Sequence, residues 1–196
     1  MRGVRAADMP LPDSVETPRL VLRRPTSADA EAIFARYASN AEVTRYLAWP
    51  THRTVAETKA FLEVSERAWA SHGAGPYLVF TRDGALLGGT GVEVETPTRA
   101  QTGYVLAQDA WGQGIATEVV RAVVSVAFKL PTLIRLYAFC HADNVASARV
   151  LEKAGFLREG LLRGYAVFPN SGAPQPADCW CYARLREPPW PPSLPP

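Results

Sequence analysis

The stretch Trp111-Gly112-Gln113-Gly114-Ile115-Ala116-Thr117-Glu118 decides how the rest of the chain is interpreted. It follows the strand-like run Gly103-Tyr104-Val105-Leu106 and opens an apolar-periodic segment that predicts a helix over residues 115–128. The first N–H groups of a helix have no internal partner, and the helix dipole adds about half a positive charge there. Gly112 and Gly114 permit positive φ angles and close approach of an anion. A strand that is followed by a glycine-rich turn and then a helix predicts a phosphate-binding loop.

Three known kinds of phosphate-binding loop could contain a turn of this kind. A dinucleotide fingerprint requires glycine at Thr117 and a carboxylate after the next strand, and both are missing. A nucleoside-triphosphate loop requires Gly-Lys-Ser/Thr, but no lysine lies between Trp111 and Phe128. The third is a pyrophosphate loop of pattern Gln/Arg-x-x-Gly-x-Gly/Ala, which Trp111-x-x-Gly114-x-Ala116 matches except at its first residue. A plain turn before a core helix is the remaining alternative.

A second motif lies downstream, at Asn144-Val145-Ala146-Ser147-Ala148-Arg149-Val150-Leu151-Glu152-Lys153-Ala154-Gly155-Phe156. Together with Trp-Gly-x-Gly-x-Ala-Thr-Glu and Arg45-Tyr46-Leu47-Ala48-Trp49-Pro50, it resembles the Rim-type ribosomal-protein N-acetyltransferases of the acetyl-CoA-dependent GNAT superfamily. The resemblance runs from residue 17 to residue 186. It implies an α+β fold, a single GNAT domain with a mixed and mostly antiparallel central sheet flanked by helices on both faces.

The bulk composition suits one globular domain, because 196 residues at 47% hydrophobic content can bury a substantial core. We expect a flexible N-terminal segment over residues 1–16, the acetyltransferase domain over 17–186 and a proline-rich tail over 187–196. A net charge of +2 is too small to indicate a nucleic-acid or membrane partner. Without an apolar signal-peptide region or zinc-like cysteine spacing, the chain is expected to be cytoplasmic, with reduced thiols and no metal.

Apolar periodicity and turn residues predict the remaining elements. A helix is expected from a cap at Ser27, a second after the capping box Thr54-x-x-Glu57, and a third from Asn144 to a left-handed Gly155. The expected strands are residues 19–24, 77–81, 86–95, 99–106, 134–139, 164–168 and 179–185.

The resemblance also implies how acetyl-CoA is held as cosubstrate. The strand before the loop splays from its neighbour, so that pantetheine pairs with it and a backbone N–H near Leu106 polarises the thioester. Asn144 contacts the pantetheine arm, and Ser147 gives a proton to the departing thiolate, although a serine there is otherwise an ordinary helix cap. Anchoring is expected to rest on the backbone, because Trp111 carries no guanidinium. The implied contacts are Val105, Leu106, Trp111, Gly112, Gln113, Gly114, Ile115, Ala116, Thr117 and Asn144.

The general base is where this sequence departs from its relatives. Many of them place a glutamate in a strand ending Ala-Glu-x-Gly-Tyr, but here the run is Ala100-Gln101-Thr102-Gly103-Tyr104, and an amide takes no proton from an ammonium group. Glu93, Glu95, Glu159 and His141 remain as alternatives, and an amine of low pKa would need no base. Glu93 and His141 join Ser147 as the candidate catalytic residues.

Substrate recognition is assigned to Tyr46 and Trp49, which follow the first helix, and to Gln101. The alternative for the two aromatic residues is that they pack beneath their loop. The sequence thus predicts transfer of acetyl to a primary amine, either a protein N-terminus or a small molecule, by direct attack in a ternary complex. A non-catalytic CoA-binding protein is the alternative that Gln101 favours and that Asn144 and Ser147 oppose. A homodimer is also open, because dimers are common among such enzymes.

Overall fold

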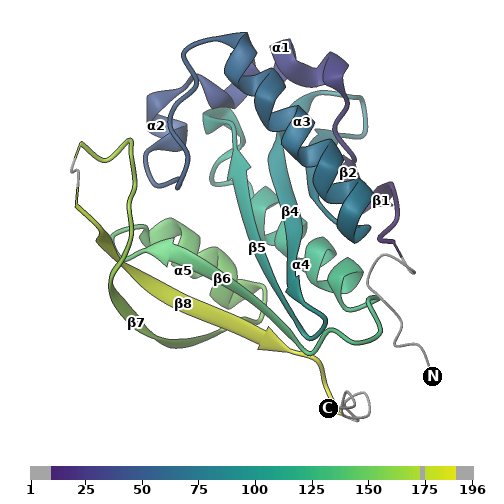
Figure 1. Cartoon of the computed structure of the whole chain (residues 1–196), viewed down its shortest axis with the longest axis vertical. Helices are drawn as coiled ribbons and strands as arrows, with labels where there is room; N and C mark the ends of the chain where they lie inside the picture. The colour runs from purple at the N-terminus through teal and green to yellow at the C-terminus, as the bar shows by residue number, and fades with distance from the viewer. Residues whose placement is uncertain (1–9, 173–174, 189–196) are drawn as a thin grey trace.

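The computed structural model describes residues 10–172 and 175–188, which form an α+β domain around one eight-stranded sheet (Figure 1). The strand order is β1-β2-β3-β4-β5-β6-β8-β7, and every neighbouring pair is antiparallel except β5 with β6. The strands are β1 (Ser14–Glu16), β2 (Leu20–Arg23), β3 (Pro76–Thr81), β4 (Leu86–Thr96), β5 (Arg99–Leu106), β6 (Arg135–His141), β7 (Leu157–Ala166) and β8 (Ala177–Leu185).

Helices cover both faces of this sheet, as expected. The first group, α1 to α3, lies on one face over the β2–β4 half, whereas α4 and α5 lie on the other face (Figure 1). The α-helices are α1 (Ala30–Ile33), α2 (Ala41–Thr44), α3 (Val55–His72), α4 (Ile115–Ala127) and α5 (Val145–Lys153), with short non-α turns at Ser27–Asp29, Phe34–Ala38 and Gln108–Ala110.

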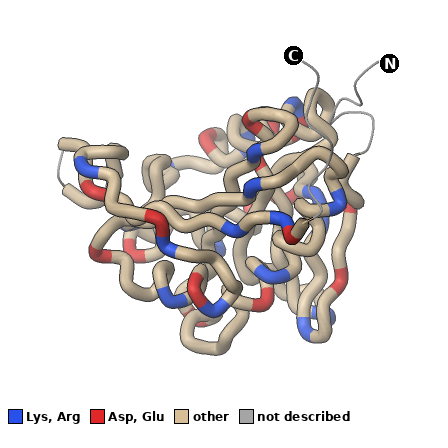
Figure 2. The backbone as a smooth tube through the Cα atoms, turned by 90° about the horizontal axis from the view of Figure 1, so that it is seen from below, with Lys and Arg blue, Asp and Glu red and all other residues tan. Residues whose placement is uncertain are grey.

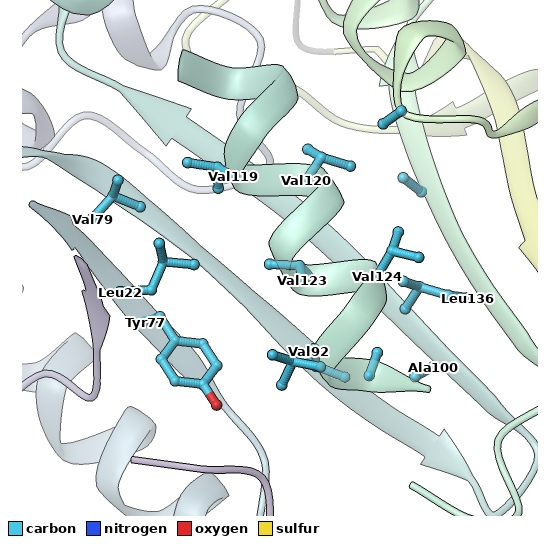
Figure 3. Close-up of a cluster of buried hydrophobic side chains, with 14 of the residues drawn as sticks. Leu22, Tyr77, Val79, Val92, Ala100, Val119, Val120, Val123, Val124 and Leu136 are labelled. Carbon is cyan, nitrogen blue, oxygen red and sulfur yellow. The ribbon is translucent and has the colours of Figure 1, made fainter. Parts of the chain in front are cut away.

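The helix α4 is fixed to the sheet by a stripe of buried valines. Val119, Val120, Val123 and Val124 share one buried cluster with side chains of β2, β3, β4, β5 and β6 (Figure 3). These positions recur at the helical period, which is why the sequence predicted the helix so closely. Burial of this stripe holds the first turn of α4 near the end of β5, so that the glycine-rich turn connects the two elements.

Two elements begin elsewhere than the sequence indicated. The strand β7 starts at Leu157 and not at residue 164, because an edge strand with exposed side chains lacks the apolar alternation used to find strands. The turn Ser27–Asp29 is capped by Thr26 and not by Ser27: Asp29 accepts hydrogen bonds from both the N–H (2.7 Å) and the hydroxyl (2.9 Å) of Thr26.

The chain joins the sheet before residue 17. The strand β1 pairs with β2, and Leu11 is buried with its N–H bonded to the Gly73 carbonyl at 2.7 Å. The part of the expected N-terminal segment over residues 10–16 is therefore packed on the domain. Residues 1–9 of that segment, and most of the expected proline-rich tail, lie outside the described residues.

Basic and acidic residues are interspersed along the backbone (Figure 2). This agrees with the small net charge of +2. Within residues 10–172 and 175–188, no helix is long and apolar enough to cross a membrane.

Candidate acetyl-transfer site

The strands β5 and β6 separate after a short paired region, and this opening organises the site. They pair at three positions, ending at Gln101 opposite Tyr137, whereas β5 continues to Leu106 and β6 to His141. Figure 1 shows the two strands diverging from there. Because Ala107 N–H bonds to β4 at Leu87 (2.8 Å) and N–H directions alternate along a strand, the N–H of Leu106 points into the opening. The gap thus presents unpaired backbone groups to an extended ligand.

The glycine-rich turn closes one end of this opening. Gly112 and Gly114 have φ angles of 73° and 74°, as the sequence indicated, and a Cβ built on Gly112 would meet nothing within 4 Å. The first backbone bond of α4 runs from Glu118 N–H to the Gly114 carbonyl at 3.2 Å. The N–H groups of the preceding residues, 115–117, have no acceptor within the helix. Open space, positive φ and free donors fit a phosphate group, so the residues present suit the phosphates of a coenzyme A thioester.

Two side chains of the turn are used to shape it. Trp111 Nε1 donates to the Leu106 carbonyl at 2.8 Å, and Gln113 Nε2 donates to the Asp109 carbonyl at 2.6 Å. The indole of Trp111 thereby ties the turn to the end of β5. Their direct contact with acetyl-CoA stays a prediction.

An arginine that the sequence analysis did not select lies beside this turn. Arg19 donates from Nε to Glu118 Oε2 at 2.6 Å and from NH1 to the Gln113 carbonyl at 3.0 Å. Thr17 also donates to Glu118, at 2.6 Å. Partial burial alone would raise the pKa of Glu118, but the hydrogen bonds from Thr17 and Arg19 and the arginine charge outweigh it and lower that pKa. Glu118 is therefore ionised and holds Arg19 in place.

The predicted proton donor sits on the α5 side of the opening. Asn144 caps α5, its side-chain oxygen accepting from Ser147 N–H at 3.0 Å. The hydroxyl of Tyr104, on β5, donates to Ser147 Oγ at 3.2 Å. Burial raises the pKa of Tyr104 to about 12, although the bond to Ser147 opposes the rise. The structure thus brings Asn144 and Ser147 together and adds Tyr104, which spacing along the chain did not connect with either.

The candidate acceptor groups lie on the opposite face of the sheet. Val92, Ala100 and Leu136 belong to the core against α4, so their chain neighbours Glu93, Gln101 and Tyr137 face the other way. The register places Glu93 opposite Gln101 and Gln101 opposite Tyr137, in one row. At the opening between β5 and β6, Ser147 therefore lies on one face of the sheet. The row of Glu93, Gln101 and Tyr137 lies on the other face.

The carboxylates near this row differ in their surroundings. Tyr137 donates to Glu95 and, at 3.2 Å, to Gln101, while Arg99 donates to Glu95 at 2.7 Å. The Tyr137 bond and the Arg99 bond and charge lower the pKa of Glu95 despite its partial desolvation. In the described part of the chain, Glu93 is exposed and has neither a hydrogen bond nor an ion pair. Of these two carboxylates, Glu95 is engaged by Tyr137 and Arg99, and Glu93 is not.

Glu159 is held apart from the row. It forms an ion pair with Arg135, whose hydrogen bonds lower the pKa of the carboxylate. This engagement makes Glu159 a weaker candidate for the base than Glu93.

His141 lies at the far end of β6, on the acceptor face. Its Nδ1 accepts from Asp143 N–H at 3.1 Å, so in the neutral ring the proton is on Nε2, which is then a donor. Its ring packs against Tyr46, with 4.9 Å between centroids, and against Phe168 at 4.8 Å. The Asp143 carboxylate also lies 3.8 Å from this Nδ1, and the role of His141 in catalysis stays a prediction.

The two loops over this face are joined by one asparagine that the sequence analysis did not single out. Asn170 donates to the carbonyls of Thr44 and Trp49, each at 2.8 Å, and its side-chain oxygen accepts from Thr51 N–H at 2.8 Å and the Thr51 hydroxyl at 3.0 Å. The Trp49 side chain packs on the hydrophobic cluster beneath α1 and α3. Of the two predicted aromatic residues, Tyr46 reaches β6, whereas Trp49 supports its loop.

The chain is similar to known proteins in both sequence and structure. Residues 19–157 match the acetyltransferase (GNAT) domain. The uncharacterized N-acetyltransferase YoaA of Bacillus subtilis (strain 168) is 34% identical over 176 residues, covering 88% of this chain and 98% of that protein.

Solved structures share the fold. A GNAT-family acetyltransferase from Bacillus anthracis superposes with a TM-score of 0.75 at 26% identity, over 88% of this chain and 98% of its own. RimL, a ribosomal-protein alpha-N-acetyltransferase with coenzyme A bound, shares the fold with a TM-score of 0.76 at 22% identity, over 89% of this chain and 97% of its own. The chain belongs to the GNAT family of N-acetyltransferases, and its fold is the one that the Rim-type resemblance implied.

Proposed function

We propose that this enzyme transfers the acetyl group of acetyl-CoA to a primary amine by direct attack within a ternary complex. The opening between β5 and β6 carries the proposal, because it exposes backbone donors at its centre and a phosphate-fitting turn at its end. The bound thioester would supply the acyl group and a thiolate leaving group.

The chain's own residues would act from opposite sides of the sheet. The Leu106 N–H would donate to the acyl oxygen, an interaction worth about 3 kcal/mol in enzymes with comparable donors. Ser147 would protonate the thiolate from the α5 side. The amine would approach from the face of Glu93, so that nucleophile and proton donor do not compete for space.

Glu93 would serve as the base, directly or through a water molecule. The position that carries glutamate in many relatives is Gln101 here, and Glu93 lies opposite it across two paired strands. In this chain the carboxylate would therefore come from β4 and not from β5. Gln101 would orient the amine through its amide.

The acceptor would lie beneath the loops joined by Asn170, against Tyr46 and His141. These rings pack against each other at an interplanar angle of 38°, and they would contact the side chain next to a peptide N-terminus or the body of a small amine. Both classes of acceptor fit the proposal.

The test is thiol release from acetyl-CoA across a panel of amines and N-terminal peptides, with wild type compared with Ser147→Ala. We expect turnover with one acceptor class and a lower kcat in the variant. Tight binding of acetyl-CoA without turnover on any acceptor would instead support a CoA-binding protein that has lost its base. Absence of binding would contradict both functions.

A further inference from the structure

The turn that would hold the pyrophosphate is accompanied by a guanidinium from a distant part of the chain. Arg19 lies 94 residues before Gln113, yet its NH1 bonds to the Gln113 carbonyl. We propose that Arg19 binds the pyrophosphate of acetyl-CoA in this protein, an inference that rests on the proposed use of acetyl-CoA. It supplies the cation that Trp111 does not.

The geometry leaves one arm of the guanidinium available. Nε and NH1 are engaged by Glu118 and Gln113, and no hydrogen bond in the described part of the chain involves Arg19 NH2. A Cβ built on Gly114 would lie 3.7 Å from this NH2, with no other atom within 4 Å. The free N–H groups therefore lie beside the residue that precedes the first turn of α4.

The surroundings of Arg19 suit an anion that arrives from solvent. Its side chain is 51% exposed, so a phosphate can reach it without displacing the core. The bond from NH1 to the Gln113 carbonyl holds the planar group beside the turn, which reduces the entropy lost when a further bond forms. A guanidinium also keeps its charge at every physiological pH.

The pair of Arg19 with Glu118 admits a second interpretation, in which it only clamps β2 to α4. The two interpretations predict opposite effects at Glu118. If Arg19 binds phosphate, removal of the Glu118 charge strengthens anion binding, because that charge opposes the incoming phosphate. If the pair is only a clamp, loss of either partner loosens the turn and weakens binding.

The experiment measures dissociation constants by calorimetry for coenzyme A, dephospho-coenzyme A and pantetheine. It uses wild type, Arg19→Gln, Arg19→Lys and Glu118→Gln, each checked by thermal unfolding. Arg19→Gln is expected to weaken both nucleotide-containing ligands by about tenfold and to leave pantetheine unchanged. The affinity of Arg19→Lys is expected to lie between those of wild type and Arg19→Gln. Glu118→Gln is expected to bind coenzyme A at least as tightly as wild type.

The salt dependence of binding gives a second readout. Removing a contact between a cation and a phosphate makes the logarithm of the dissociation constant depend less steeply on the logarithm of the salt concentration. Arg19→Gln should therefore show a shallower slope than wild type. A slope and affinity equal to wild type would overturn the proposal.

Two other results would also overturn it. A loss confined to coenzyme A and absent with dephospho-coenzyme A would assign Arg19 to the 3′-phosphate, and an equal loss in Glu118→Gln would make the pair a clamp. The result for wild type distinguishes this proposal from the proposed function. Failure of wild type to bind coenzyme A would contradict the proposed function and the role of Arg19 together, whereas an effect seen only in the variants concerns the role of Arg19.

Discussion

The phenolic hydroxyl of Tyr104 donates a hydrogen bond to Ser147 Oγ at 3.2 Å, joining β5 to the first turn of α5 on one side of the opening. A donor to Ser147 Oγ stabilises the charge that develops on this oxygen when the serine gives up its own proton. Tyr104 would therefore be a positioning residue for proton transfer to the thiolate.

We predict that Tyr104→Phe lowers kcat by about tenfold with little change in KM for acetyl-CoA, because it removes one hydrogen bond and keeps the ring. A double-mutant cycle with Ser147→Ala is the check, since residues that act together are not additive. Acetyl thioesters of more acidic thiols should reduce the defect. Additive effects that do not depend on the leaving group would show that Tyr104 only packs.

Glu93 and Glu95 provide a matched pair for the proposed base. Glu93→Gln is expected to reduce kcat/KM for a protonated amine by about a hundredfold, the lower range for general-base catalysis. Glu95→Gln is expected to have the smaller effect, because Glu95 is already engaged by Tyr137 and Arg99. Steady-state kinetics with each variant separates them, and equal losses would contradict the assignment.

The open space at Gly112 can be tested against a glycine with similar backbone strain elsewhere. Gly112 and Gly84 both have positive φ, 73° and 92°, and a Cβ on either would meet nothing within 4 Å. Alanine at each should lower stability by about 1 kcal/mol. Only Gly112→Ala is expected to weaken coenzyme A binding, since its methyl group occupies the approach to the turn. Equal affinities would argue against phosphate binding there.

Asn170 is expected to be the residue that holds the acceptor loops in place. Asn170→Ala removes its four hydrogen bonds to Thr44, Trp49 and Thr51 and should lower the free energy of unfolding by about 2 kcal/mol. The KM for the acceptor should rise while the affinity for coenzyme A stays unchanged. Asn170→Asp keeps the oxygen that accepts from Thr51 but sets a carboxylate oxygen against the carbonyls of Thr44 and Trp49, so it should not restore the KM for the acceptor.

A pH dependence of stability follows from Asp29. Burial would raise the pKa of this carboxyl, but bonds from Arg23 and Thr26 outweigh it and lower the pKa from 3.8. Because the folded-state pKa is the lower one, the stabilisation is complete above the unfolded-state pKa and is lost as pH falls through the folded-state value. We expect the difference in Tm between wild type and Asp29→Asn to be largest above the unfolded-state pKa of 3.8 and to shrink as the pH falls below it. A difference that grows toward low pH would contradict this sign.

Local sequence patterns accounted for the elements nearest the phosphate turn. The strand β5 and the start of α4 lie where alternation, glycine and helical periodicity placed them, because each signal acts over a few residues and agrees with burial. The strand β7 was found only in part. Its edge position leaves most side chains in solvent, so its apolar pattern carries little information about where it begins.

The sequence by itself determined the family and the glycine-rich turn, because these depend on motifs that are contiguous in the chain. The roles of Asn144 and Ser147, which a contiguous motif also indicated, stay predictions. Only the tertiary structure decided which distant residues stand beside them. Arg19 meets Glu118 across 99 residues, and Tyr104 meets Ser147 across 43. Such contacts depend on strand register and on how the helices pack on the sheet, and these are set by the burial of the whole core and not by any local stretch.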